Sequence, residues 1–138
     1  MNRSDLQALA NLREREATIL LNNGCFEGAY YLLGYAVECA LKACFAKQIR
    51  EYDFPDKKLI ENVWSHDLKR LLELAGLKAE FDAEVARERQ FELNWNEVKD
   101  WKESDRYERS IPEPKVRSFF SAVQNPTSGV LPWLKVRW

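Results

Sequence analysis

Residues 28–43 read GAYYLLGYAVECALKA. As a helix, this stretch would be apolar around more than half of its circumference, which makes it the most informative part of the sequence about the fold. Residues 25–50 contain no proline and are rich in alanine, leucine and aromatic side chains, which favours one long helix. At 100° per residue the apolar positions cover an arc of about 200°, wider than the buried stripe of a surface helix. These positions are Ala29, Leu33, Ala36, Val37, Ala40, Leu41 and Cys44. The stretch therefore predicts a central helix.

The sequence before this stretch predicts a second long helix. Apolar residues recur at helical spacing over residues 5–23. Ser4 and Gln7 form a capping-box pattern at its start, and Asn23 and Gly24 supply a stop signal at its end.

The sequence after it predicts shorter helices and no strand. Ser65 is expected to cap a helix over residues 66–75, and Gly76 to end it. Further helical segments are expected over residues 78–90, a short turn with Trp95, Val98 and Trp101, residues 114–124 and residues 132–138, with a charged connector over 104–114. The sequence therefore predicts a single all-α domain over residues 1–138.

Composition excludes several classes of function. Lys and Arg total 21 against 22 Asp and Glu, so the net charge of -1 gives no general attraction to nucleic acid or anionic membranes. The apolar stretch over residues 29–46 is interrupted by Glu38 and Lys42, and the first residues are polar, so we expect a cytoplasmic protein without membrane association. With one histidine and three cysteines on one predicted helix, we expect no metal site, no cofactor and no disulfide framework, and we expect the cysteines in the core.

A polar and aromatic stripe runs along the central helix beside its apolar arc. It comprises Glu27, Tyr31, Tyr35, Glu38 and Lys42. The tyrosine rings could stack on a nucleobase and their hydroxyls could bind phosphate or sugar. The Glu38/Lys42 pair has the favourable i, i+4 orientation. The alternative for Tyr31, Tyr35, Glu38 and Lys42 is packing in the core or at a homodimer interface.

Two other groups carry possible chemistry. His66 could act as a general acid or base, or it could serve only to hydrogen-bond the start of its helix. Arg106, Tyr107 and Arg109 form the best basic and aromatic cluster of the chain, although neighbouring acidic residues almost neutralise it. The alternative for this cluster is a solvated connector held in place by Tyr107.

Several stretches together resemble the HEPN domains of prokaryotes. The GAYYLLGYAVECALKA stretch is similar to their second-helix signature, and residues 65–77, SHDLKRLLELAGL, are similar to their His-Asp-Leu helix. Later landmarks are Asn94-Trp95, Trp101, Arg106-Tyr107 and residues 129–135, GVLPWLK. The resemblance covers most of the chain. It implies an all-α, antiparallel up-and-down bundle of four to five helices that is often dimeric. The superfamily includes RNA-cleaving toxins, partners of nucleotidyltransferases and non-catalytic members.

The chain departs from the RNA-cleaving pattern of that superfamily. RNA-cleaving members carry an Arg that is followed after four to six residues by a His, but residues 59–61 ahead of His66 are Leu, Ile and Glu. The Tyr that accepts a nucleotidyl group in some toxins is also missing, since Asp67 and Leu68 follow His66. We therefore expect a non-catalytic or degenerate dimeric module that acts with a nucleotidyltransferase, nucleotide or RNA partner in a defence or toxin-antitoxin setting.

Two alternatives remain open. One is a metal-independent RNase that uses His66 with an Arg distant in sequence, such as Arg106. The other is a purely structural interaction protein. A nucleotidyltransferase reading frame beside this one would favour the first expectation over both.

Overall fold

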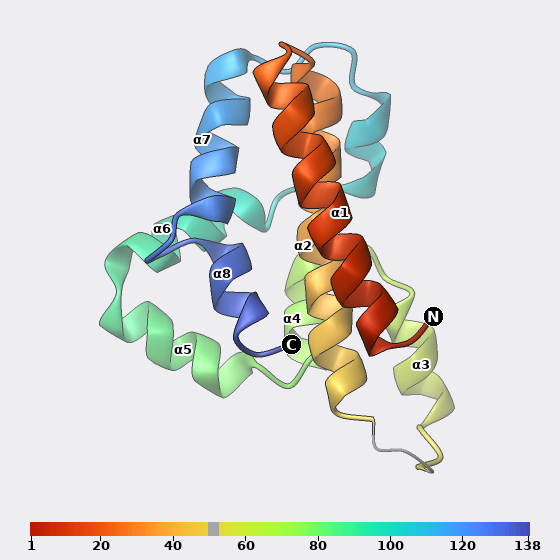
Figure 1. Ribbon diagram of the computed structural model, residues 1–138. Coiled ribbons are helices and arrows are strands. Elements are labelled where there is room, and N and C mark those ends of the chain that lie inside the picture. Colours follow the sequence, from red (N-terminus) through yellow and green to blue (C-terminus); the bar gives the residue numbers. More distant parts are fainter. Residues whose placement is uncertain (50–52) are drawn as a thin grey trace.

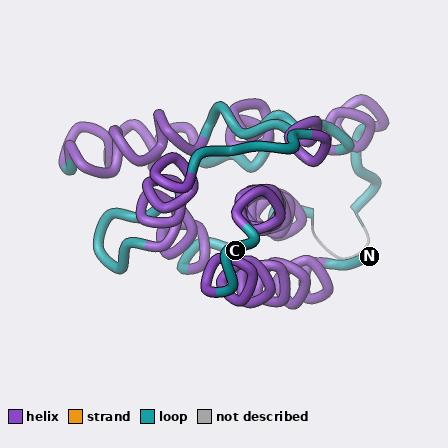
Figure 2. The backbone as a smooth tube through the Cα atoms, turned by 90° about the horizontal axis from the view of Figure 1, so that it is seen from above, coloured by secondary structure: helices purple, strands orange, loops and turns teal. Residues whose placement is uncertain are grey.

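The computed structural model describes residues 1–49 and 53–138, and in this part of the chain the backbone consists of helices and loops without a strand (Figures 1 and 2). The elements are α1 (Arg3–Asn22), α2 (Phe26–Lys47), α3 (Lys57–Val63), α4 (Leu68–Leu74), α5 (Lys78–Arg87), α6 (Arg89–Val98), the 3-10 helix η1 (Glu103–Tyr107), α7 (Glu113–Gln124) and α8 (Val130–Lys135). The predicted all-helical bundle is confirmed. Its described part has more and shorter helices than the expected four to five, because α3 was not predicted and the segment after α4 is broken.

Helix α1 packs antiparallel to α2 along most of its length (Figure 1). Its cap differs from the predicted one. Asn2 Oδ1 accepts a hydrogen bond from the Asp5 backbone at 2.9 Å, and Asp5 Oδ2 accepts one from the Asn2 backbone at 2.9 Å. The reciprocal box therefore begins two residues earlier than Ser4. The predicted stop is confirmed, since the helix ends at Asn22 and Gly24 has φ 74°, a left-handed conformation that glycine adopts without steric cost.

Helix α2 is the central helix, as predicted. All seven positions of the predicted apolar arc are buried. Cys39 and Cys44 lie in the core, but Cys25 is exposed at the N-cap of α2, so the expectation of three core cysteines was wrong for Cys25. Helix α2 ends at Lys47, and the predicted end at residue 50 lies outside the described residues.

The segment before α4 differs most from expectation. Helix α3 forms there, capped by Asp56, whose side chain accepts from the backbones of Lys58 and Leu59. The cap of α4 is Asp67 and not Ser65, because Asp67 Oδ1 accepts from the backbone of Lys69 at 3.0 Å. Residues 64–67 thus form a loop, and His66 lies in that loop ahead of α4.

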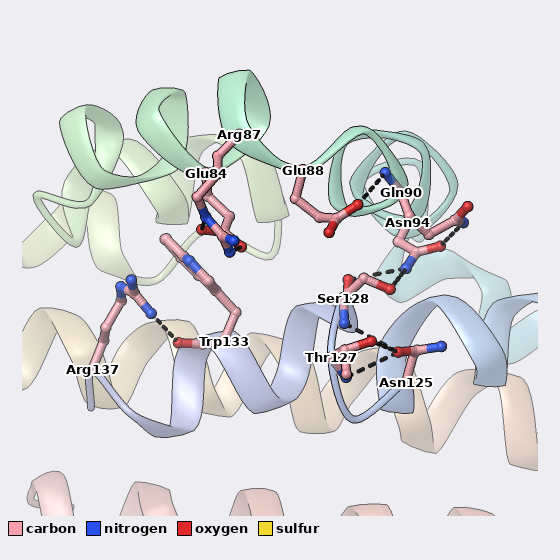
Figure 3. A network of polar contacts seen from close by, with 10 residues as sticks. All are labelled: Glu84, Arg87, Glu88, Gln90, Asn94, Asn125, Thr127, Ser128, Trp133 and Arg137. Atoms are coloured by element: carbon pink, nitrogen blue, oxygen red, sulfur yellow. Dashed lines mark hydrogen bonds and ion pairs between the residues drawn. The ribbon is translucent and has the colours of Figure 1, made fainter.

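The helix predicted over residues 78–90 ends at Arg87, and the separate turn predicted with Trp95, Val98 and Trp101 is the longer helix α6, which ends before Trp101. Glu88 has extended backbone angles, φ -131° and ψ 102°, and it separates α5 from α6. The α6 side chain Asn94 is buried and donates to the Ser128 carbonyl at 2.9 Å, which ties α6 to the turn between α7 and α8 (Figure 3). Asn125 organises the same turn by accepting from the backbones of Thr127 and Ser128. This network holds α6 against the turn that joins α7 and α8.

The charged connector expected over residues 104–114 contains η1, which packs against α2. The side chain of Trp101, just before η1, is almost fully buried. It lies against Gly34 so closely that a Cβ atom at Gly34 would overlap the indole ring. The glycine thus brings η1 beside the polar stripe of α2. Within the described residues, no helix has the length and apolar character needed to cross a membrane.

Candidate functional site

His66 joins two carboxylates that come from distant parts of the chain. Its Nδ1 is 2.9 Å from Oε1 of Glu38 in α2, and its Nε2 is 3.0 Å from Oε2 of Glu103 in η1. Each ring nitrogen of His66 therefore has a carboxylate oxygen within 3.0 Å. Asp67 fills the helix-start role considered for His66. The histidine instead connects the loop before α4 with α2 and η1.

Glu38 is the buried centre of this cluster. Its side chain is 1% exposed, and its Oε1 accepts from Lys42 Nζ at 2.8 Å as well as from His66. Burial of a carboxylate is costly unless cations and hydrogen bonds compensate it, and these two groups provide the compensation. The other oxygen, Oε2, is buried and has no hydrogen-bond partner among the described residues. One face of this carboxylate therefore remains unsatisfied.

Glu103 extends the cluster to Arg106. Its Oε1 accepts from the Arg106 guanidinium at 3.2 Å, while its Oε2 contacts His66. Arg106 also donates to the Tyr107 hydroxyl at 2.9 Å, and this hydrogen bond raises the pKa of the guanidinium. The Arg106 side chain is exposed, and its guanidinium carbon lies 4.9 Å from the centre of the Tyr107 ring. A single carboxylate thus holds the histidine and the arginine near each other.

Aromatic rings border the charged groups. Tyr31 stacks on Tyr35, with 6.4 Å between the ring centres, and on Trp101, with 5.8 Å between them. Burial raises the pKa of Tyr35 above its ordinary value. The row from Tyr31 to Lys42 is a candidate dimer interface, but the chain's own Trp101 contacts Tyr31 and its own His66 contacts Glu38. The rings pack inside one molecule, and dimerisation stays a prediction.

Most of the candidate residues come together. Tyr31, Tyr35, Glu38, Lys42, His66, Arg106 and Tyr107 lie in or next to one cluster. Arg109 is exposed beyond η1, and among the described residues it makes no ion pair with the cluster. Sequence reasoning missed Glu103 as a member. The available signal was its position three residues before Arg106, which places the two side chains on one side of a short helix.

A cavity of about 450 Å³ opens on one side of the cluster, between α1, α2 and α3. Its charged lining residues are Glu38, Lys42 and His66, and the rest of its lining is mostly apolar. The apolar part includes Leu6, Leu9, Phe45, Ile49, Ile60, Val63 and Trp64. Its size falls within the range of small-molecule sites in proteins.

A more open hollow of about 420 Å³ lies on the other side of His66. Lys69, Lys99 and Lys102 line it, and so do the carboxylates of Asp67, Asp100 and Glu103. The positive and negative side chains balance there, so this surface has no excess of positive charge with which to attract a phosphate.

Comparison with known proteins identified no relative of this chain. Neither family models, curated proteins nor solved structures gave a match to the chain. The resemblance to HEPN domains therefore rests on the residues quoted above, and functional argument rests on the cluster and the cavity.

Proposed function

We propose that this chain is a HEPN-like module without RNase activity of its own, which acts as a dimer with a nucleotidyltransferase, nucleotide or RNA partner in a defence or toxin-antitoxin setting. The partner and the setting come from the resemblance of residues 28–43 and 65–77. One structural observation carries the non-catalytic part of the proposal: both ring nitrogens of His66 are held by carboxylates.

A histidine catalyses proton transfer only through a nitrogen that reaches the reacting group. In this chain Nδ1 contacts Glu38 and Nε2 contacts Glu103. Lys42 and Arg106 are paired with the same two carboxylates, so the cluster neutralises its own charges. These features support a structural and binding role over RNA cleavage.

One observation favours the RNase alternative. The two oxygens of Glu103 contact His66 Nε2 and Arg106, so these two groups converge on a position that an anion already occupies. If a substrate phosphate replaced this carboxylate, it would meet a proton donor and a guanidinium at once. Under this alternative, Glu103 competes with the substrate.

Removing Glu103 distinguishes the two candidates. The unaltered chain, Glu103→Ala, His66→Ala and Arg106→Ala are purified identically and incubated with the same single-stranded RNA. Glu108→Ala serves as the control, because Glu108 is an exposed carboxylate just after η1 and outside the cluster. We expect no cleavage by any of them. Cleavage by Glu103→Ala that disappears when His66→Ala is added would establish the RNase alternative and overturn the non-catalytic proposal.

A further inference from the structure

The cavity between α1, α2 and α3 combines apolar walls with one unsatisfied acceptor. Helix α1 contributes Leu6 and Leu9, α2 contributes Phe45 and Ala46, and α3 contributes Ile60 and Val63. The Glu38 carboxylate belongs to the same lining, and its Oε2 has no hydrogen-bond partner among the described residues. A group that supplied an N–H to this oxygen would remove the cost of a buried, unpaired acceptor.

The neighbours of Glu38 decide what kind of donor fits. Lys42 Nζ lies 2.8 Å from Oε1 of the same carboxylate, and the His66 ring lies 2.9 Å from it. A further cation at Oε2 would be repelled by the Lys42 ammonium across a few ångströms of poorly screened space. A neutral N–H avoids that repulsion and still makes a strong hydrogen bond with an ionised acceptor. Glu38 belongs to the cavity lining, so a donor bound there approaches the same carboxylate that Lys42 and His66 contact.

We propose that this cavity binds a small neutral ring compound, whose apolar body contacts α1, α2 and α3 and whose N–H donates to Glu38. Trp64 lines the cavity and is 76% exposed, so binding would also remove this large apolar ring from water. The proposal goes beyond the function proposed above, because it concerns the cavity and not the Glu103 side of His66. It holds or fails independently of any effect on RNA.

A matched pair of probes tests the hydrogen bond on the unaltered chain. Indole carries one neutral N–H, and 1-methylindole has the same ring system without it. Binding is measured by titration in two-dimensional NMR, with the methyl signals of Ile60 and Val63 as reporters of the cavity. We expect indole to shift these signals and to bind about tenfold more tightly than 1-methylindole, the typical effect of a hydrogen bond to a charged group. Equal affinities, or no shift with indole up to its solubility, would overturn the proposal.

A pair of variants tests the location. Ala46 lines the cavity on α2, and Ala46→Phe places a ring inside it. Ala8→Phe adds the same ring at an exposed position of α1 as the control. Indole binding should fall at least tenfold in the first and stay unchanged in the second. Trp64→Ala changes only an exposed side chain and should also weaken binding, which keeps the location testable if Ala46→Phe does not fold. Unchanged binding in the folded cavity variants would place indole elsewhere and refute the assignment.

Discussion

Gly34→Ala should destabilise the protein, although alanine is the better helix former. Gly34 lies in the middle of α2, and a Cβ atom there would overlap the indole ring of Trp101, which is 1% exposed. The substitution gains about 0.5–1 kcal/mol of intrinsic helix stability. Overpacking a well-filled core costs about 1–3 kcal/mol, and a large buried ring has little room to move. We expect the free energy of unfolding to fall by about 1–2 kcal/mol.

Gly28→Ala in the same helix is the matched control. A Cβ at Gly28 would lie 3.3 Å from Leu20 Cδ1, which is the far end of a flexible side chain. The variant should therefore keep most of the gain of about 0.5–1 kcal/mol from replacing a helical glycine. Urea titrations followed by circular dichroism should show the midpoint moving down for Gly34→Ala, while for Gly28→Ala it stays level or moves up, with about 2 kcal/mol between the two.

The same pair of variants tests the geometry of the cluster. Trp101 stands two residues before Glu103, so a displaced indole should carry η1 away from α2 and separate Glu103 from His66. The ring signals of the single histidine should therefore shift in NMR spectra of Gly34→Ala and keep their positions in Gly28→Ala. If both variants are equally stable and leave the histidine signals alone, Trp101 does not pack on Gly34 and the placement of η1 is wrong.

Two further expectations follow from buried groups. Burial, with smaller contributions from nearby carboxylates, raises the pKa of Tyr30 to about 12, so the unfolded chain loses the phenolic proton first and the free energy of unfolding falls between about pH 10 and 12. In Tyr30→Phe the free energy of unfolding should fall by about 2–3 kcal/mol less over this pH range, and an unchanged fall would contradict the raised pKa of Tyr30. Burial also raises the pKa of the Cys39 and Cys44 thiols to about 11, so a thiol reagent should label exposed Cys25 alone in the folded protein and all three cysteines after unfolding. Rapid labelling of all three thiols in the folded state would refute the burial of Cys39 and Cys44.

The central helix could be predicted because its signal is local and long. Twenty-two residues without proline hold an apolar arc too wide for a surface helix, and every position assigned to that arc is buried. The ends of the shorter helices were harder to predict, because neighbouring polar residues compete to cap the same helix. Ser65 and Asp67 can both cap a helix, and Asp67 does so here because its carboxylate reaches the backbone of Lys69 and Arg70. Similarly, the break between α5 and α6 depends on the backbone conformation of Glu88, which no proline or glycine announces.

The cluster itself could be predicted only in parts. The Glu38/Lys42 pair follows from helical spacing, and it is present at 2.8 Å. The contact between Glu38 and His66 spans 28 residues, and it depends on how the loop before α4 lies against α2. No periodicity in a single sequence encodes such a contact. The charge-balanced connector around Arg106 indicated a solvated segment, but burial of Trp101 brings η1 against the bundle.

One arrangement connects the fold with the proposed function. The buried indole of Trp101 against Gly34 sets η1 beside α2, and this position lets Glu103 bridge His66 and Arg106. The Glu103 carboxylate thus occupies the position where a phosphate would contact both groups. Because Glu103 is already attached to the chain, it loses less entropy in binding there than a free phosphate would. An incoming RNA phosphate must displace this internal anion from two partners at once, in a region with balanced charge. Under the proposed function, the packing that completes the bundle works against RNA cleavage, while Glu38 also lines the apolar cavity in which we propose a ligand.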